Sequence, residues 1–209
     1  MKRVFLLLVL GFLATQRTDA GDRGRLDDGL LDPTWFGTVG EFRQTENVDF
    51  LWVKPGFSLQ GRTLQITPWQ DFVFLRKEKR DTKDAAKAGE LTELMASRIR
   101  GALSSALEGR TKVSRDEGEL SLVGRFVEVN AGSKAAKWLV GFGAGSATAT
   151  WDIKIVDNAS GETLAAIHHR SISGTNMSEI DDKIIKWLDR FAIAMKGDLS
   201  EYTTGERAK

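Results

Sequence analysis

The sequence predicts an α+β fold, a two-layer sandwich in which a mainly antiparallel sheet of about 4–6 strands carries two long helices on one face. Three observations predict it. Several segments alternate apolar and polar residues, as strands do, and two segments repeat apolar residues at three- and four-residue spacing, as helices do. A short turn joins two of the strands, which makes that pair an antiparallel hairpin.

The first elements follow from turn signals and alternation. Residues 49–53 and 57–61 resemble an extended segment that is interrupted by the turn Lys54-Pro55-Gly56, because proline presets the turn and glycine accepts a positive φ. A second strand ends at Pro68. Apolar spacing then predicts a helix from about Thr82 to Leu107. Residues 119–130 predict an interior strand with a bend or bulge at Gly124, because apolar residues occur on both of its faces.

The second half continues the sheet and closes it with a helix. Residues 147–155 alternate strictly, which predicts one buried apolar face and one polar face. The turn at 157–162 leads to the partner strand of a hairpin. The last helix opens at Ser178, which can cap its first turn, and ends at Gly197. Its apolar stripe consists of Ile180, Ile184, Trp187, Leu188, Phe191 and Met195.

The chain begins with the three-part pattern of a secretory signal. Lys2 and Arg3 precede an apolar run over residues 4–14, and small residues at positions 18 and 20 suit cleavage after Ala20. The run is shorter than the roughly 20 residues that a membrane-spanning helix needs. We therefore expect an exported bacterial protein, periplasmic or secreted and open to association with the outer membrane; a permanent amino-terminal anchor is the alternative.

Four parts follow from these patterns. Residues 1–20 are the expected cleavable signal peptide, and residues 21–47 an extended leader that starts with glycine and mixed charges. Residues 48–197 form a single α+β domain, and residues 198–209 a flexible tail. No further apolar stretch is long enough to cross a membrane.

The amino-acid composition excludes several kinds of functional site. The chain has no cysteine, which excludes disulfides, thiolate metal sites and a cysteine nucleophile. A formal net charge of +1 gives no general attraction to nucleic acid. His168 and His169 are neighbours in a predicted strand, so their side chains point to opposite faces and cannot share a metal ion. We therefore expect no catalytic set, no metal site and no cofactor.

The glycine-rich segment 132–146 raises a separate question. Its lysines precede Gly141, Gly143 and Gly145, whereas a phosphate-binding loop needs a lysine after its last glycine. The segment is a tight loop that leads into a close-packed strand, and a phosphate site is not expected. Four residues of this loop are the candidate contacts for a partner protein or a membrane surface: Lys134, Lys137, Trp138 and Phe142.

Two stretches, VDFLWVKPGFSL and LSLVGRFVEVNAGSKAAKWLVGFGAGSATATWDIKIVDNASGETL, together with the helical ending, carry a family resemblance. Over roughly residues 48–197 the chain resembles an uncharacterised family of bacterial exported proteins, domain of unknown function 4410. Members of that family are often lipoproteins, and this chain departs from them because no cysteine follows its signal. The resemblance implies no catalytic or binding residue.

These observations together favour a non-enzymatic envelope domain that acts through contacts with unidentified envelope proteins, by its sheet edge or by the Trp138 loop. Two alternatives stay open. One is a small-ligand-binding protein or enzyme with a cleft at residues 132–146. The other is peripheral membrane binding through the same loop.

Overall fold

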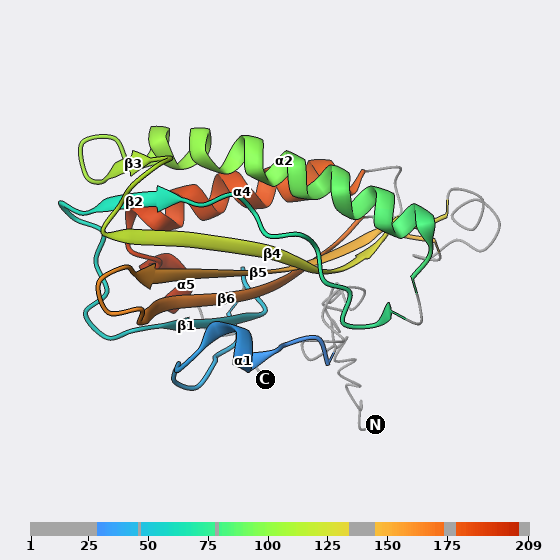
Figure 1. The fold of residues 1–209 in the computed structure, drawn as a ribbon, viewed down its shortest axis with the longest axis horizontal. Coiled ribbons are helices and arrows are strands. Elements are labelled where there is room, and N and C mark those ends of the chain that lie inside the picture. Colours follow the sequence, from blue (N-terminus) through green and yellow to red (C-terminus); the bar gives the residue numbers. More distant parts are fainter. Residues whose placement is uncertain (1–28, 46, 78–79, 134–144, 174–178, 205–209) are drawn as a thin grey trace, which may run out of the picture.

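The computed structural model describes residues 29–45, 47–77, 80–133, 145–173 and 179–204. In this part of the chain six strands form one sheet in the order β1-β6-β5-β4-β2-β3, with two long helices on one face (Figure 1). The strands are β1 (Phe50–Val53), β2 (Thr63–Ile66), β3 (Lys112–Ser114), β4 (Leu120–Asn130), β5 (Thr148–Asp157) and β6 (Thr163–Ile172). The helices are α1 (Pro33–Phe36), α2 (Thr82–Ala106), α4 (Ile180–Lys196) and α5 (Ser200–Thr204).

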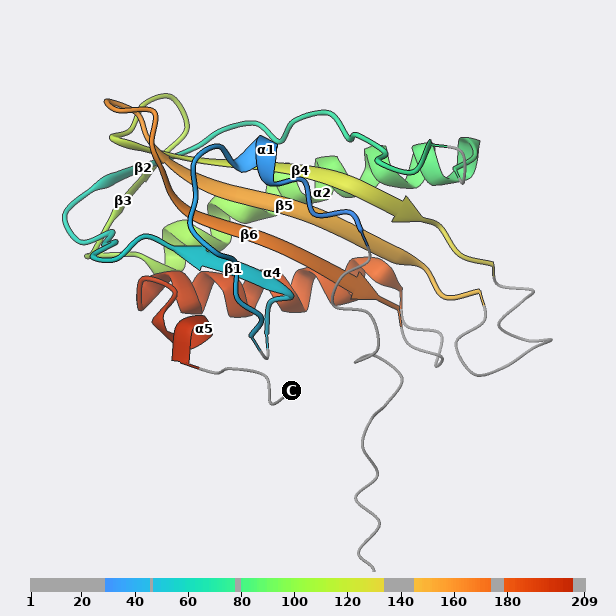
Figure 2. The same ribbon diagram turned by 90° about the horizontal axis from the view of Figure 1, so that it is seen from below.

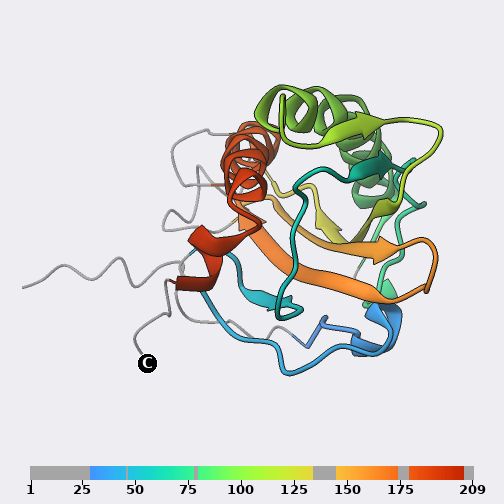
Figure 3. The ribbon, with the colours of Figure 1, turned by 90° about the vertical axis from the view of Figure 1, so that its left-hand side faces the viewer.

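The sheet confirms the predicted fold class. The pairs β1–β6, β6–β5 and β5–β4 are antiparallel, whereas β2 runs parallel to both β4 and β3. Seen end-on, α2 and α4 lie side by side and cover the same face (Figure 3). The main hydrophobic core fills the space between these two helices and the sheet.

Helix α2 begins at the predicted Thr82 and ends one residue before the predicted Leu107. Its first turn is held by side-chain hydrogen bonds. The Asp81 side chain accepts hydrogen bonds from the backbone N–H groups of Lys83 and Asp84, and the Asp84 carboxylate accepts one from the N–H of Asp81. This reciprocal arrangement is a capping box. The residues that α2 buries in the core are Ala88, Leu91, Met95, Ile99 and Leu103.

Helix α4 buries the whole apolar stripe that the sequence predicts. It begins at Ile180, with Glu179 at the N-cap position and no side-chain capping bond. The predicted cap, Ser178, lies outside the described residues. Gly197 is the C-cap, as expected.

Two glycines inside α2 give a first prediction. A Cβ atom added to Gly89 or Gly101 would meet nothing within 4 Å. Because glycine in a helix interior costs up to about 1 kcal/mol relative to alanine, Gly101→Ala should raise the free energy of unfolding by about 0.5–1 kcal/mol in urea denaturation. Gly109→Ala is the control and should lower it, because Gly109 has a φ of +74°. No gain for Gly101→Ala would contradict the packing described.

The expected bend at Gly124 is wrong. Gly124 pairs in register with Ile153, and the register shift of β4 falls between Phe126 and Glu128. The glycine serves another purpose, because a Cβ atom there would lie 2.5 Å from Cε2 of the buried Trp69. The indole ring occupies the space that a side chain would need.

Gly124→Ala should therefore force the Trp69 ring out of place and lower the free energy of unfolding by about 1–3 kcal/mol. Chemical denaturation followed by far-UV circular dichroism measures the loss. Trp69→Ala should cost stability alone but remove most of the additional cost of Gly124→Ala. Simple additivity in this double-mutant cycle would mean that the two residues do not collide.

The second face of the sheet is also covered. The sequence predicts an open polar face on β5, yet Thr150 and Asp152 on that face are fully buried. The cover is the segment 29–45, which crosses this face and includes α1 (Figure 2). Within the segment, Leu30 and Phe36 are buried. Residues 29–45, which the sequence assigns to an extended leader, thus pack against the sheet.

The end of the described chain is likewise packed. Residues 198–204 belong to the predicted flexible tail, but α5 forms there and both Leu199 and Tyr202 are buried. Burial raises the pKa of the Tyr202 hydroxyl above its usual value. The Asp198 carboxylate accepts a hydrogen bond of 2.9 Å from Leu59 N–H and pairs with Arg110. These contacts tie the end of the chain to the loop between β1 and β2.

Candidate functional site

The predicted contact residues Lys134, Lys137, Trp138 and Phe142 lie outside the described residues. The structure describes the base of their loop, where Ser133 N–H donates to the carbonyl of Gly145 over 2.8 Å. Gly132 is held there at a φ of +73°, and a Cβ atom on it would lie 2.6 Å from that same carbonyl oxygen. Glycine at position 132 therefore allows the two ends of the loop to meet.

The two histidines lie on opposite faces of β6, as predicted. His169 stacks on Trp187 of α4, with ring centroids 5.5 Å apart, on the helix-covered face. His168 lies on the other face, with its Nδ1 atom 2.7 Å from the Asp152 carboxylate. Within the described ranges no group of three or more histidine, cysteine, aspartate or glutamate side chains is placed to hold a metal ion.

A buried charged row crosses the centre of the second sheet face. Arg125 on β4, Asp152 on β5 and His168 on β6 are direct neighbours in the strand register. Nε and Nη2 of Arg125 each lie 2.9 Å from Oδ2 of Asp152, and His168 contacts Oδ1. All three side chains are buried. The Asp152 carboxylate thus has a partner on either side.

The N-terminal segment roofs this row. The Asp32 carboxylate lies 3.3 Å from Nη2 of Arg125, and both the Arg125 guanidinium and the Lys154 ammonium lie over the Trp35 ring, at 4.5 and 4.4 Å from its centroid. Lys154 also donates to the Trp35 carbonyl over 2.5 Å. The buried charged row and the residues Asp32 and Trp35 that cover it therefore form one network of ion pairs, hydrogen bonds and cation–π contacts.

The environment shifts two titrating groups of this roof. Hydrogen bonds from the Thr34 side chain, and after them from Arg125, hold the pKa of Asp32 below its usual value. Burial, together with the nearby Arg125 charge, lowers the pKa of Lys154. Arg125 contributes to both shifts, because its charge stabilises the Asp32 anion and repels the Lys154 cation.

Sequence reasoning missed this network because its members are far apart in the chain and look like ordinary polar positions of strands. The available signal was the run of polar residues on alternate positions of β5, from Thr148 to Lys154. That run reads as a solvent-facing strand face unless a cover is known. The cover comes from Asp32 and Trp35, which precede the predicted domain.

An exposed apolar edge is the second candidate site. We call residues 67–77 the edge segment, which follows the outer side of β4 beyond the end of β2 (Figure 2). Its hydrogen bonds to β4 come from the N–H groups of Thr67, Gln70, Val73 and Leu75. Phe72 and Phe74 pack against the core, whereas Val73 is 40% and Leu75 is 38% exposed. Among the described residues, Ile193 is the one other exposed large apolar side chain.

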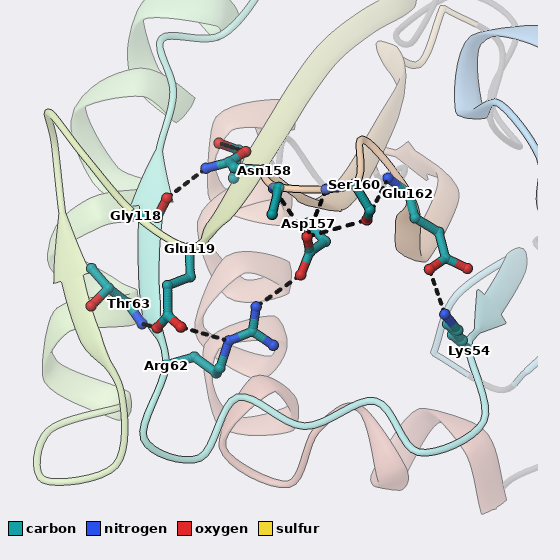
Figure 4. Close-up of polar contacts among 11 residues, drawn as sticks. Lys54, Arg62, Thr63, Gly118, Glu119, Asp157, Asn158, Ser160 and Glu162 are labelled. Carbon is teal, nitrogen blue, oxygen red and sulfur yellow. Dashed lines mark hydrogen bonds and ion pairs between the residues drawn. The ribbon is translucent and has the colours of Figure 1, made fainter.

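A polar groove is the third candidate. It has a volume of about 390 Å³ and lies between the loop 54–62 and the hairpin turn 157–162 (Figure 4). Ion pairs span it on two sides, Lys54 to Glu162 at 2.5 Å and Arg62 to Asp157 at 2.9 Å. It lies at the end of the sheet where β5 ends and β6 begins, opposite the end at which β4 ends (Figure 1). Figure 4 also shows the ion pair between Arg62 and Glu119, in which Nε and Oε1 lie 3.4 Å apart.

The acidic group of this groove is also part of the turn. Asp157 accepts hydrogen bonds from the backbone N–H of Ser160 and of Ala159, each 3.1 Å long. The Ser160 contact first, and then the Arg62 guanidinium, lower the pKa of Asp157. The carboxylate therefore stays ionised and keeps the hairpin turn attached to the loop opposite.

Comparison with known proteins gives a family and distant structural likenesses. The family model "Domain of unknown function (DUF4410)" matches residues 54–176. No curated protein matches the sequence. In the described part of the chain no helix combines the length and the apolar character that crossing a membrane requires.

Several solved structures are distantly similar to this chain. The PelC dodecamer from Paraburkholderia phytofirmans has a TM-score of 0.46 at 8% identity and covers 70% of this chain and 93% of that one. Protein XCC0632 from Xanthomonas campestris has a TM-score of 0.43 at 11% identity, covering 71% and 93%. Lipoprotein GNA1162 from Neisseria meningitidis has a TM-score of 0.37 at 10% identity, covering 66% and 98%.

Proposed function

The chain belongs to the DUF4410 family, and on that premise we propose that it is a non-enzymatic exported domain of the bacterial envelope that acts through protein–protein contacts. The observation that carries the proposal is the edge segment. Val73 and Leu75 expose neighbouring apolar side chains along the rim of the sheet, where an extended partner can add to it.

The buried charges support a binding role over catalysis. Arg125, Asp152 and His168 contact one another beneath the N-terminal segment and away from solvent. A catalytic group has to reach its substrate. These buried side chains instead help to hold the N-terminal segment against the sheet. The four loop residues Lys134, Lys137, Trp138 and Phe142 are a second proposed contact region.

Site-specific crosslinking in cells tests the proposal. A photo-crosslinking amino acid at Val73, or at Trp138, should give a discrete adduct, and the same group at Glu93 on the exposed side of α2 should give none. Trp138→Ala, combined with the crosslinker at Val73, should leave the Val73 adduct unchanged. If neither Val73 nor Trp138 yields an adduct above the Glu93 background, the proposal fails.

Export has its own test. Cleavage of the proposed signal peptide gives a mature chain that begins at Gly21, which mass spectrometry of the protein from fractionated cells detects directly. A full-length chain found in the cytoplasmic fraction would contradict export.

A small-ligand-binding function is the second candidate, and the groove between Lys54 and Glu162 favours it. A groove of about 390 Å³ is within the roughly 300–1,000 Å³ of typical ligand sites. Ligand-induced thermal stabilisation across a library of small molecules tests it. Any stabilisation should disappear in Arg62→Ala and persist in Arg98→Ala, which changes the same residue type on the exposed side of α2.

A further inference from the structure

We propose that the polar groove between residues 54–62 and 157–162 binds a compact zwitterion, an α-amino acid with an apolar side chain. The inference rests on the small-ligand-binding function proposed for this groove, because it names the ligand class of the same site. Two features of the groove point to this class. Its charges are balanced and lie on opposite walls, and apolar side chains lie between them.

The charges of the groove are divided between its two walls. Lys54 and Arg62 come from the loop between β1 and β2, whereas Asp157 and Glu162 come from the hairpin turn between β5 and β6 (Figure 4). The charged residues that line the groove are these two cations and two anions. A ligand with a single charge is attracted by one wall and repelled by the other. A ligand that carries both charges can present the opposite sign to each wall.

Each ion pair leaves polar atoms available to a ligand. Lys54 is 39% and Glu162 is 45% exposed, and the ion pair between them uses Oε2 of the carboxylate. Arg62 uses Nε for Glu119 and Nη2 for Asp157. Among the described residues, Oε1 of Glu162 and Nη1 of Arg62 have no hydrogen-bond or ion-pair partner. A ligand carboxylate can therefore contact Lys54 and Arg62, and a ligand ammonium can contact Glu162, while both ion pairs stay in place.

The ion pairs also limit the distance between the two charges of the ligand. The walls approach closely at both pairs, with 2.5 Å between Lys54 Nζ and Glu162 Oε2 and 2.9 Å between Arg62 Nη2 and Asp157 Oδ2. A ligand that binds between the pairs, with its dipole antiparallel to both, needs an ammonium and a carboxylate that are similarly close. An α-amino acid meets this requirement because both groups are attached to the same carbon atom.

The groove also offers contacts to an apolar side chain. Phe57 and Leu164 line it, and both are partly buried side chains that pack against the hydrophobic core. An aliphatic side chain that is removed from water against them adds affinity in proportion to the apolar area buried. Because the ligand is small and the charges are partly exposed, we expect a dissociation constant on the order of 0.1–1 mM.

Isothermal titration calorimetry with related compounds tests the ligand class. L-Leucine is the probe and should bind, whereas glycine should bind at least about threefold more weakly because it has no apolar side chain. N-acetyl-leucine lacks the ammonium, leucinamide lacks the carboxylate, and 6-aminohexanoate holds the two charges far apart. Each of these three should bind at least about tenfold more weakly than L-leucine, because each loses one of the two charged contacts.

Substitutions test whether L-leucine binds in the groove. Lys54→Gln and Glu162→Gln should each weaken binding about three- to tenfold, because each removes one charged contact. The swap Lys54→Glu/Glu162→Lys keeps an ion pair at this place but reverses the charge of each wall, so it should weaken binding at least about tenfold. If the pair only held the groove together, the swap would bind L-leucine normally. Lys83→Gln and Glu93→Gln, at exposed positions of α2, are the controls and should leave the dissociation constant unchanged.

The outcomes separate the ligand class from the proposed functions. Equal binding of L-leucine and N-acetyl-leucine, no binding of L-leucine up to about 20 mM, or unchanged binding by the swap variant overturns the zwitterion assignment. If a compound of another class still stabilises the protein and requires Arg62, the groove binds small ligands and only the ligand class is wrong. If no compound does, the small-ligand function fails as well. The crosslinks at Val73 and Trp138 test the protein–protein function independently of both results.

Discussion

Asp152→Ala is expected to lower the free energy of unfolding by about 3–5 kcal/mol. The carboxylate is fully buried and accepts from Arg125 on one side while His168 contacts it on the other. Without it, the more distant Asp32 is the one remaining counter-charge of the buried Arg125 guanidinium among the residues that the structure describes. Removing one partner of a buried ion pair is costly because the remaining charge stays away from water. Urea denaturation followed by far-UV circular dichroism measures the change.

Two further variants make this test decisive. If Asp152→Ala does not fold, Asp152→Asn keeps the size of the side chain and one acceptor oxygen, and it should give a smaller but measurable loss. Asp116→Ala is the matched control, because that carboxylate is exposed and should change stability by less than about 0.5 kcal/mol. A loss below about 1 kcal/mol for Asp152→Ala would mean that the buried row contributes little to the fold.

Phe36→Ala is expected to cost about 3–5 kcal/mol. The ring is fully buried and packs edge-on against Trp35 and Phe42, with ring centroids 4.9 and 5.2 Å away. The Phe36 carbonyl also accepts a 2.6 Å hydrogen bond from the buried Thr163 hydroxyl of β6. Truncating this side chain removes apolar contacts and leaves a cavity between the N-terminal segment and the sheet.

Thermal unfolding of the Phe36→Ala variant tests whether residues 29–45 belong to the folded domain. If residues 29–45 were an extended leader, Phe36→Ala would leave the thermal midpoint of unfolding unchanged. Ile193→Ala is the control for loss of a large apolar side chain at an exposed site and should change stability by less than about 0.5 kcal/mol. A Phe36→Ala variant as stable as Ile193→Ala would show that the segment contributes nothing to folding.

The sequence predicts correctly those helices and strands that depend on residues close together in the chain. The apolar spacing along α2 predicts that helix without reference to the rest of the chain. The alternation from Ala147 to Ile155 predicted β5 for the same reason, since it depends only on the two-residue period of a strand. The family resemblance was confirmed over residues 54–176.

Features that depend on distant contacts could not be predicted in this way. Asp152 looks solvent-facing until Trp35 and Asp32 are known to cover it. Gly124 looks like a bulge because nothing nearby in the sequence announces that Trp69 lies over it. The three-residue strand β3 is too short for a periodic signal, and it is defined by its pairing with β2. Each of these is decided by a residue that is remote in sequence.

The pairing of β1 with β6 has a consequence for how the chain folds. Phe50 lies opposite His168, so the first strand of the sheet waits for a partner that follows after more than half of the chain. During synthesis from the amino terminus, β1 has no edge to join until the β5–β6 hairpin exists. Loop closure over such a distance is slow, so we expect β1 to join the sheet after the β5–β6 hairpin has formed.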